Sequence, residues 1–111
     1  MIQSQERGTN QYAIFLIRYQ LENVSVPEWR QEIERFIANI AVDPELSGRI
    51  TYRSLRHKNG EYFHLASAAD EVAMKALQTR EFFRQYSERV KSVATGGVVD
   101  VSPLELIAET T

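Results

Sequence analysis

The segment Lys58-Asn59-Gly60 constrains the fold more than any other part of this chain. Asn-Gly is favoured in two-residue type I′ hairpin turns, because both turn residues must adopt a positive φ. A run with alternating apolar and polar residues precedes it at positions 49–57, and the strand-like run Tyr62-Phe63-His64-Leu65-Ala66-Ser67 follows it. The sequence therefore predicts that residues 49–57 pair with residues 61–67 as an antiparallel hairpin.

An amphipathic helix is expected before this hairpin. Pro27 suits the first turn of a helix, with Ser25 or Val26 near the cap. Apolar residues then recur at three- and four-residue spacings, which indicates about four turns of helix. These residues are Trp29, Ile33, Phe36, Ile37 and Ile40.

A second helix is expected after the hairpin, capped by Asp70 or Ser67. Its apolar positions also show helical periodicity, and the pattern allows a break near Thr79. These positions are Val72, Ala73, Ala76, Leu77, Phe83, Tyr86 and Val90. Gly96-Gly97 is expected to end the helix.

Two outer strands complete the predicted domain. Residues 12–21 are rich in β-branched and aromatic residues on both alternate faces, and a last strand begins at Val98, with Pro103 marking a bend or an edge. The order β-α-β-β-α-β is that of the ferredoxin-like split βαβ motif, an α+β fold with a four-stranded antiparallel sheet. We expect a flexible polar segment at residues 1–11 and a single domain over residues 12–111.

In this fold both helices cover one face of the sheet, yet the strands carry apolar residues on both faces. A large exposed apolar patch usually meets a partner. The sequence therefore predicts a homodimer in which the open sheet faces of two copies pack together, with two-fold symmetry.

Composition excludes several classes of function. With 13 Lys and Arg against 15 Asp and Glu, the chain lacks the basic excess of a general nucleic-acid binder. It has no cysteine, its N-terminal residues are polar, and no apolar run reaches membrane-spanning length. Two histidines set seven apart do not by themselves make a metal site. We expect a cytoplasmic protein that binds neither membranes nor nucleic acids and holds no metal.

The pattern resembles the antibiotic biosynthesis monooxygenase-like group of the dimeric α+β barrel superfamily, over residues 12–107. The resemblance is carried by three segments: Tyr62-Phe63-His64-Leu65 leading into Ala69-Asp70-Glu71, Leu77-x-Thr79-x-x-Phe82-Phe83-x-x-Tyr86, and Val101-Ser102-Pro103-Leu104. It implies a dimeric barrel. From some relatives it implies oxygenation of quinols or anthrones without a cofactor. Other relatives degrade haem, and many have no assigned activity.

The chain departs from the family at the residues that perform the chemistry. Many quinol-oxidising relatives carry a histidine in the second helix, where this chain places Ala76-Leu77. Haem-degrading relatives use an asparagine in the first strand, a tryptophan in the second helix and a histidine further along that helix. The residues nearest to these three positions in this chain are 15–17, Ala76 and Tyr86. Tyr86 could ligate iron as tyrosinate or serve as a core or dimer-contact residue. Haem binding is therefore the least favoured function, and no cofactor is expected.

His64 is the candidate catalytic residue. A strand histidine beside Tyr62, and near Tyr52 across the hairpin, could act as a base near neutral pH. The alternative is a histidine that is hydrogen-bonded as part of the structure. His57 adjoins the turn and is expected to be exposed.

An aromatic set could line a substrate cavity between helices and sheet: Trp29, Phe36, Tyr52, Phe83 and Tyr86. Tyr52 or Tyr86 would orient the substrate oxygen. The same residues could equally fill the core. Two functions stay open: a cofactor-independent monooxygenase-like enzyme acting on a quinol or anthrone, and a non-catalytic dimeric module that binds a hydrophobic small molecule or a protein partner. An open cavity reaching His64 would favour the enzyme.

Overall fold

The computed structural model describes residues 13–110, and the predicted flexible segment 1–11 lies outside them, as does Tyr12. The elements are β1 (Ala13–Gln20), α2 (Val26–Val42), β2 (Ile50–Arg56), β3 (Glu61–Ala68), α3 (Glu71–Gln78), α4 (Glu81–Val93), the 3₁₀ turn η2 (Thr95–Gly97) and β4 (Asp100–Leu104). The predicted β-α-β-β-α-β order is confirmed, with the second helix divided in two.

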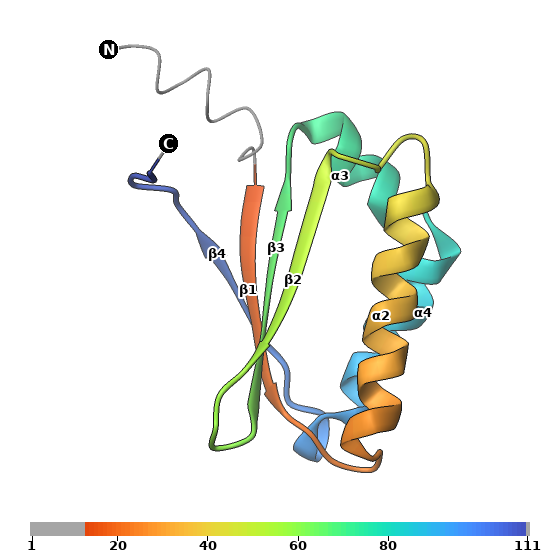
Figure 1. The fold of residues 1–111 in the computed structure, drawn as a ribbon, viewed down its shortest axis with the longest axis vertical. Coiled ribbons are helices and arrows are strands. Elements are labelled where there is room, and N and C mark those ends of the chain that lie inside the picture. The colour runs from red at the N-terminus through yellow and green to blue at the C-terminus, as the bar shows by residue number, and fades with distance from the viewer. Residues whose placement is uncertain (1–12, 111) are drawn as a thin grey trace.

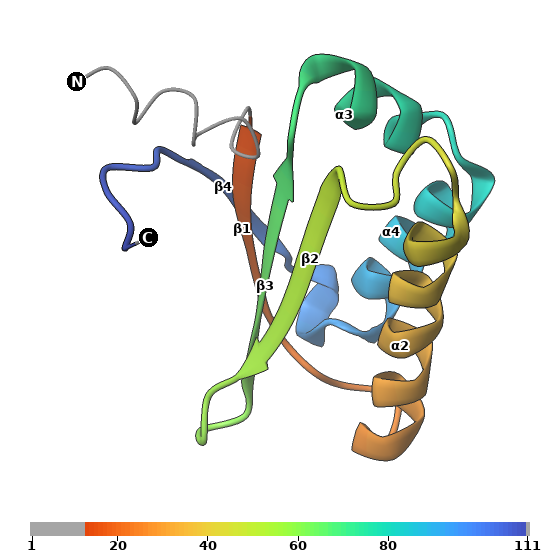
Figure 2. The same ribbon diagram turned by 45° about the horizontal axis from the view of Figure 1, so that its top comes forward.

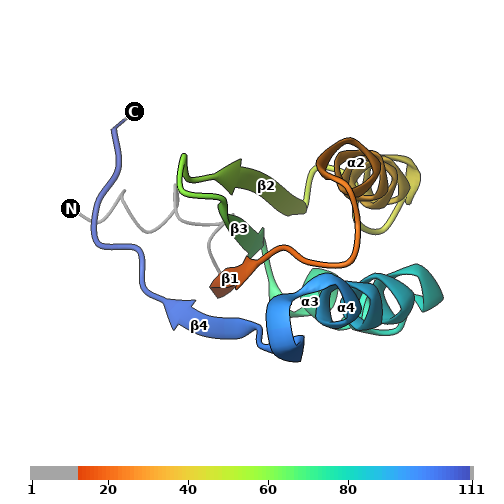
Figure 3. The ribbon, with the colours of Figure 1, turned by 90° about the horizontal axis from the view of Figure 1, so that it is seen from below.

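The sheet has the strand order β2-β3-β1-β4, and every neighbouring pair is antiparallel. Figures 1 and 3 show α2, α3 and α4 on one side of it. The predicted hairpin is confirmed, with Ile50 opposite Ala68 and Arg56 opposite Tyr62, but its turn is not the two-residue type I′ form, because Gly60 has a positive φ and Asn59 does not. The last strand begins at Asp100 rather than at Val98, because pairing with β1 starts only where Asp100 reaches Arg18.

Both predicted helix starts are confirmed by their caps. The Ser25 hydroxyl accepts a hydrogen bond from the Glu28 backbone N–H, and the Glu28 carboxylate accepts one in return from the Ser25 backbone N–H. This capping box satisfies backbone donors that the first turn leaves free. At α3, the Asp70 carboxylate accepts from the Ala73 backbone N–H at 2.8 Å.

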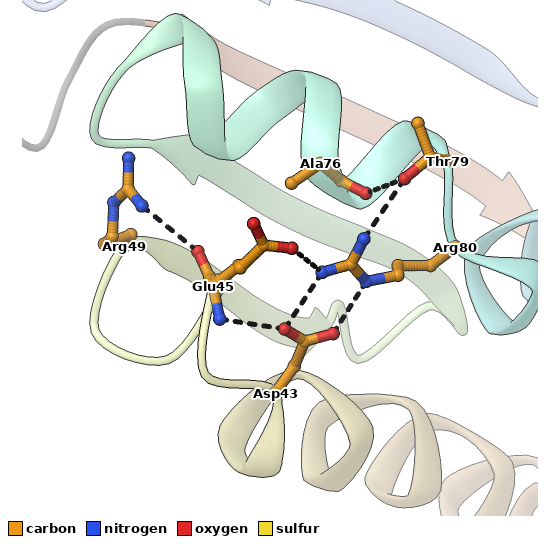
Figure 4. A network of polar contacts seen from close by, with 6 residues as sticks. All are labelled: Asp43, Glu45, Arg49, Ala76, Thr79 and Arg80. Carbon is orange, nitrogen blue, oxygen red and sulfur yellow. Dashed lines mark hydrogen bonds and ion pairs between the residues drawn. The ribbon is translucent and has the colours of Figure 1, made fainter.

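The break between α3 and α4 is tied to the loop that follows α2 (Figure 4). The Arg80 guanidinium donates to both carboxylate oxygens of Asp43, at 2.7 and 3.1 Å, and also to Glu45. The Thr79 hydroxyl donates to the carbonyl of Ala76. These bonds lower the pKa of Asp43 and raise that of Arg80. The predicted break near Thr79 is therefore confirmed, and the ion pairs of Arg80 hold the corner between α3 and α4 against the loop after α2.

Strand alternation gives the sheet two different faces. The face toward the helices carries the buried residues Tyr19, Ile50, Tyr62, His64 and Ala68. The opposite face carries a row of partly or largely exposed apolar side chains: Ile14, Leu16, Leu55, Phe63, Leu65 and Leu104. Residues 105–110 continue from β4 on the side away from the helices (Figures 2 and 3). Within residues 13–110, no helix combines the length and the apolar character needed to cross a bilayer.

Candidate functional site

A cavity of about 340 Å³ lies between the sheet and the helices α3 and α4. Its lining consists of Phe15, Ile17, Phe36, Tyr52, Ala66, Met74, Leu77, Gln78, Phe83, Tyr86, Ser87, Val90, Lys91, Val99 and Val101. The volume falls in the range of small-molecule sites, which are mostly apolar with a few placed polar groups. The cavity therefore has the size and character of a binding site for a small hydrophobic molecule.

Two periodicities produce this lining. The strand residues share the alternate set that faces the helices, since Ala66 lies opposite both Phe15 and Tyr52. On α4, the lining residues stand at positions i, i+3, i+4, i+7 and i+8, which is one helix face. They are Phe83, Tyr86, Ser87, Val90 and Lys91.

One polar pair stands in this apolar wall. The hydroxyl oxygens of Tyr52 and Tyr86 lie 3.1 Å apart, within hydrogen-bond distance. Burial raises the pKa of both phenols, so both stay protonated at neutral pH. Two hydroxyls carry two hydrogens, and the bond between them uses one. The other is available to an acceptor in the cavity, and neither phenol is suited to act as a base.

Phe36 and Tyr86 separate this cavity from a second hollow. Their rings stack at 3.9 Å between centroids, with planes 3° apart. On the far side lies a groove of about 300 Å³ between α2 and α4, where Glu32 holds Arg89 in a two-bonded ion pair. Phe36 and Tyr86 line both hollows. The stacked rings of Phe36 and Tyr86 therefore stand between the cavity and the groove.

His64 lies at the centre of a chain of hydrogen bonds that is buried except at its exposed end, Ser54. Its Nδ1 is 2.6 Å from the Ser54 hydroxyl, its Nε2 is 2.5 Å from the Tyr19 hydroxyl, and the Trp29 indole N–H donates to that same hydroxyl at 2.7 Å. The indole can only donate, so the Tyr19 oxygen accepts from Trp29. Among its neighbours in this chain only Nε2 can accept the Tyr19 hydrogen, so we assign that bond as Tyr19 O–H to Nε2. Nδ1 then carries the imidazole hydrogen and donates to Ser54. This network implies a neutral His64.

The environment of His64 supports that protonation state. The side chain is fully buried, and desolvation lowers the pKa of the imidazole to about 4. Both ring nitrogens are already engaged, and His64 does not line the cavity. Its closest link to the cavity is Tyr52, whose ring stacks on the imidazole at 5.2 Å between centroids.

The structure divides the sequence-predicted site residues into two groups. Phe36, Tyr52, Phe83 and Tyr86 line the cavity together. Trp29 and His64 belong instead to the hydrogen-bond chain of Trp29, Tyr19, His64 and Ser54, called the closed chain below. Trp29 also stacks on Tyr86, with 6.0 Å between ring centroids. The cavity is open as the enzyme hypothesis required, but it does not reach His64.

Sequence reasoning missed the partners of His64. Strand alternation could have placed Ser54 on the face of His64, since the two lie in one hairpin. Tyr19 could not be placed in this way, because its contact depends on the pairing of β1 with β3. Lys91, which lines the cavity, also went unnoticed because a lysine in the last turn of a helix is unremarkable in a sequence.

The described residues offer little to iron. Among residues 13–110, no group of three or more histidine, cysteine, aspartate or glutamate side chains could hold a metal ion. A tyrosinate ligand at Tyr86 is opposed by the raised pKa of this phenol and by its bond to Tyr52.

Comparison with known proteins places the fold. No family model matches the sequence, and no curated protein matches it either. A variant of SnoaB, the cofactor-independent oxygenase from Streptomyces nogalater, is 15% identical and superposes with a TM-score of 0.69 over 87% of this chain and 94% of that chain. The chain has the fold of this oxygenase.

Two further solved structures extend this likeness. A candidate antibiotic biosynthesis monooxygenase from Caulobacter crescentus is 17% identical, with a TM-score of 0.67 over 95% of this chain and 99% of that chain. A dimeric ferredoxin-like protein of unknown function from Jannaschia sp. is also 17% identical, with a TM-score of 0.58 over 85% and 99% of the two chains. The predicted ferredoxin-like α+β class, and the resemblance to the antibiotic biosynthesis monooxygenase-like group, are confirmed at the level of fold.

Proposed function

We propose that this chain is a cofactor-independent monooxygenase-like protein that oxygenates a small aromatic substrate of the quinol or anthrone type. The observation that carries the proposal is the apolar cavity whose wall holds the protonated Tyr52 and Tyr86 hydroxyls. The likeness to an oxygenase supports the reaction class by analogy of fold, which is a weaker argument than the site itself.

The hydroxyl pair would act on the ionised substrate. A hydrogen bond donated by Tyr52 or Tyr86 to the substrate oxygen favours its anionic form and so lowers the pKa of the substrate. The deprotonated ring carbon then gives electrons to dioxygen and forms a carbon-bound hydroperoxide, which loses water to leave a carbonyl. The substrate supplies all the electrons, so this reaction needs no electron-carrying cofactor.

His64 is the proposed base, and the geometry sets a condition on that role. Its Nε2 can accept a substrate proton only after the Tyr19 hydroxyl has moved away, and Tyr52 must no longer separate the ring from the cavity. In this structure the imidazole of His64 packs against the ring of Tyr52. Substitution of His64 therefore tests two roles, proton transfer and positioning, which a pH profile separates.

Oxygen uptake against a panel of hydroquinones, naphthoquinols and anthrones tests the proposal. We expect uptake above the rate in buffer. Loss of one hydrogen bond to a charged group, worth about 1.5–3 kcal/mol, should lower kcat/KM by roughly 10- to 100-fold in Tyr52→Phe and in Tyr86→Phe. Tyr62→Phe is the matched control, because Tyr62 is buried outside the cavity lining. Uptake no faster than in buffer with every substrate would overturn the oxygenase proposal.

For His64, the informative variant is His64→Gln, which keeps a side chain able to hydrogen-bond. If His64 is the base, this variant loses most of the uptake, and the residual rate no longer falls as the pH drops through the pKa of the imidazole. If His64 only positions Tyr52, this fall in rate persists and KM changes more than kcat.

A non-catalytic binding module is the second candidate, and one observation favours it. Neither an imidazole nor a carboxylate stands among the cavity-lining side chains of the described residues. Such a module would bind an aromatic molecule, with quenching or enhancement of Trp29 fluorescence, and leave oxygen uptake at the rate in buffer.

We further propose that two copies pair through the open sheet face, where Leu16 lies opposite Leu65. A solved structure of the same fold is described as dimeric, which supports the pairing of two copies. Sedimentation equilibrium should show a dimer for the natural chain and a monomer for Leu16→Lys. Val42→Lys, at a side chain that is 79% exposed on α2, should stay dimeric. A dimer that survives Leu16→Lys with native circular dichroism would contradict the proposed interface.

A further inference from the structure

Lys91 carries the only formal charge among the side chains that line the cavity within residues 13–110. The other polar lining residues are neutral: Tyr52, Tyr86, Gln78 and Ser87. Lys91 lines the cavity and is also exposed, so its charge lies in contact with both the apolar lining and water, which partly screens it. A single cation in such a wall selects among ligands by their charge.

The charge of Lys91 is not used elsewhere in the described part of the chain. On the same helix, Arg84 is held by Glu81 and Glu88, and Arg89 is held by Glu32. Lys91 has no carboxylate within ion-pair distance among residues 13–110. An anion that enters the cavity would therefore not have to displace an internal partner.

Lys91 and the tyrosine pair stand toward opposite ends of the cavity. Tyr52 belongs to β2 and Val101 to β4, the two outer strands of the sheet. Three strand spacings separate them, or about 14 Å. Lys91 is in the last turn of α4, which leads through η2 into β4, and Figure 3 shows this part of α4 beside β4. Tyr86 precedes Lys91 by five residues, a rise of about 7.5 Å along the helix.

We infer that the cavity takes an aromatic carboxylate, with its carboxylate on Lys91 at the β4 end and a ring oxygen at the hydroxyls of Tyr52 and Tyr86. The volume suits a core of two or three fused rings, since an apolar cavity of about 150 Å³ holds one benzene ring. This inference rests on the proposed use of the cavity as the ligand site, but not on the oxygenation reaction. Anchoring at Lys91 would decide which ring carbon faces dioxygen.

Calorimetric titration with 6-hydroxy-2-naphthoic acid and with its methyl ester tests the inference, because the two probes differ only in the charged group. We expect the acid to bind about 2- to 5-fold more tightly than the ester, the ratio that a solvent-screened ion pair gives. Lys91→Met keeps most of the side-chain stem and should remove this preference by weakening the acid alone. Lys91→Arg should retain most of it.

Lys58→Met, in the exposed hairpin turn, is the matched control and should leave both affinities unchanged. Equal affinities of acid and ester in the natural chain would overturn the inference, as would an equal loss of both in Lys91→Met. Failure to bind either probe would overturn it together with the use of the cavity. Preference for the acid without oxygen uptake would support it while the oxygenase proposal fails.

Discussion

Two polar clusters on the helix side of the sheet each centre on tyrosine, but their surroundings are opposite. In one, Tyr19 is buried and bonded to both His64 and Trp29. In the other, the Tyr52 and Tyr86 hydroxyls are bonded to each other beside open volume. The clusters touch through ring contacts, Tyr52 with His64 and Trp29 with Tyr86.

The difference lies in what each cluster leaves unsatisfied. Within residues 13–110, no buried side-chain nitrogen or oxygen lacks a hydrogen-bond partner. In the closed chain the hydrogens of the Trp29 indole, the Tyr19 hydroxyl and the imidazole are committed, and none of these three residues lines either hollow, so their polarity serves the fold. The Tyr52 and Tyr86 pair retains one hydrogen next to a cavity, so its polarity can serve a ligand. A buried histidine is therefore a weaker sign of a site than two phenols with room beside them.

The largest expected effect is on the closed chain. Trp29→Ala removes a fully buried indole and should lower the free energy of unfolding by about 3–5 kcal/mol. Phe83→Ala, in the cavity wall, should cost clearly less, because part of that ring already borders open space. Urea denaturation followed by circular dichroism measures both. Equal losses would show that the two regions are packed alike.

The sharpest contrast uses the same substitution in both clusters. Tyr19→Phe leaves the Trp29 indole N–H and Nε2 of His64 without their partner, and should cost about 2–3 kcal/mol. Tyr52→Phe should cost about 1 kcal/mol or less, since the Tyr86 hydroxyl can turn toward the cavity. Ligand affinity should change in the opposite order. A Tyr52→Phe variant that loses stability but not ligand affinity would contradict the assignment of the Tyr52 and Tyr86 pair to ligand binding.

The pH dependence of stability tests the buried imidazole. Desolvation lowers the pKa of folded His64 from the ordinary 6.5 to about 4. The unfolded chain therefore binds the extra proton at higher pH than the folded chain does. Stability is complete above about pH 6.5 and falls as the pH drops toward 4, by about 3 kcal/mol in all.

Urea denaturation at pH 7.5, 6 and 5 measures this loss. His64→Gln is the reference, because the carboxylates contribute equally to both proteins and cancel in the difference. A difference that stays constant over this pH range would show that the folded imidazole keeps its ordinary pKa and is therefore hydrated.

The smallest expected effect concerns the corner between α3 and α4. Arg80→Gln removes the ion pairs with Asp43 and Glu45, and should lower the melting temperature by less than Tyr19→Phe does. The charged groups there are partly exposed, so salt screens them. Arg30→Gln is the control, since Arg30 forms an exposed pair with Glu34. Equal melting temperatures for the two variants would show that the corner is held by packing alone.

Much of the fold could be predicted from the sequence because its signals are local. The Asn59-Gly60 turn, the Ser25 cap and the apolar periodicity of α2 each act within a few residues. Together they led to the correct element order, the break near Thr79 and four residues of the cavity wall. Boundaries were less exact, as at β4, where pairing with β1 and not local preference decides the first strand residue.

The sequence by itself determined which residues face the helices, since alternation in strands and the 3.6-residue repeat in helices are properties of each segment alone. Tertiary structure decided the partners of His64, because Tyr19 reaches it only through the pairing of β1 with β3, across 45 residues of chain. Tertiary structure also decided where the side chains leave a cavity between the sheet and the helices. Whether the space beside Tyr52, Tyr86 and Lys91 is filled depends on side chains from several elements together, and no single segment encodes that volume.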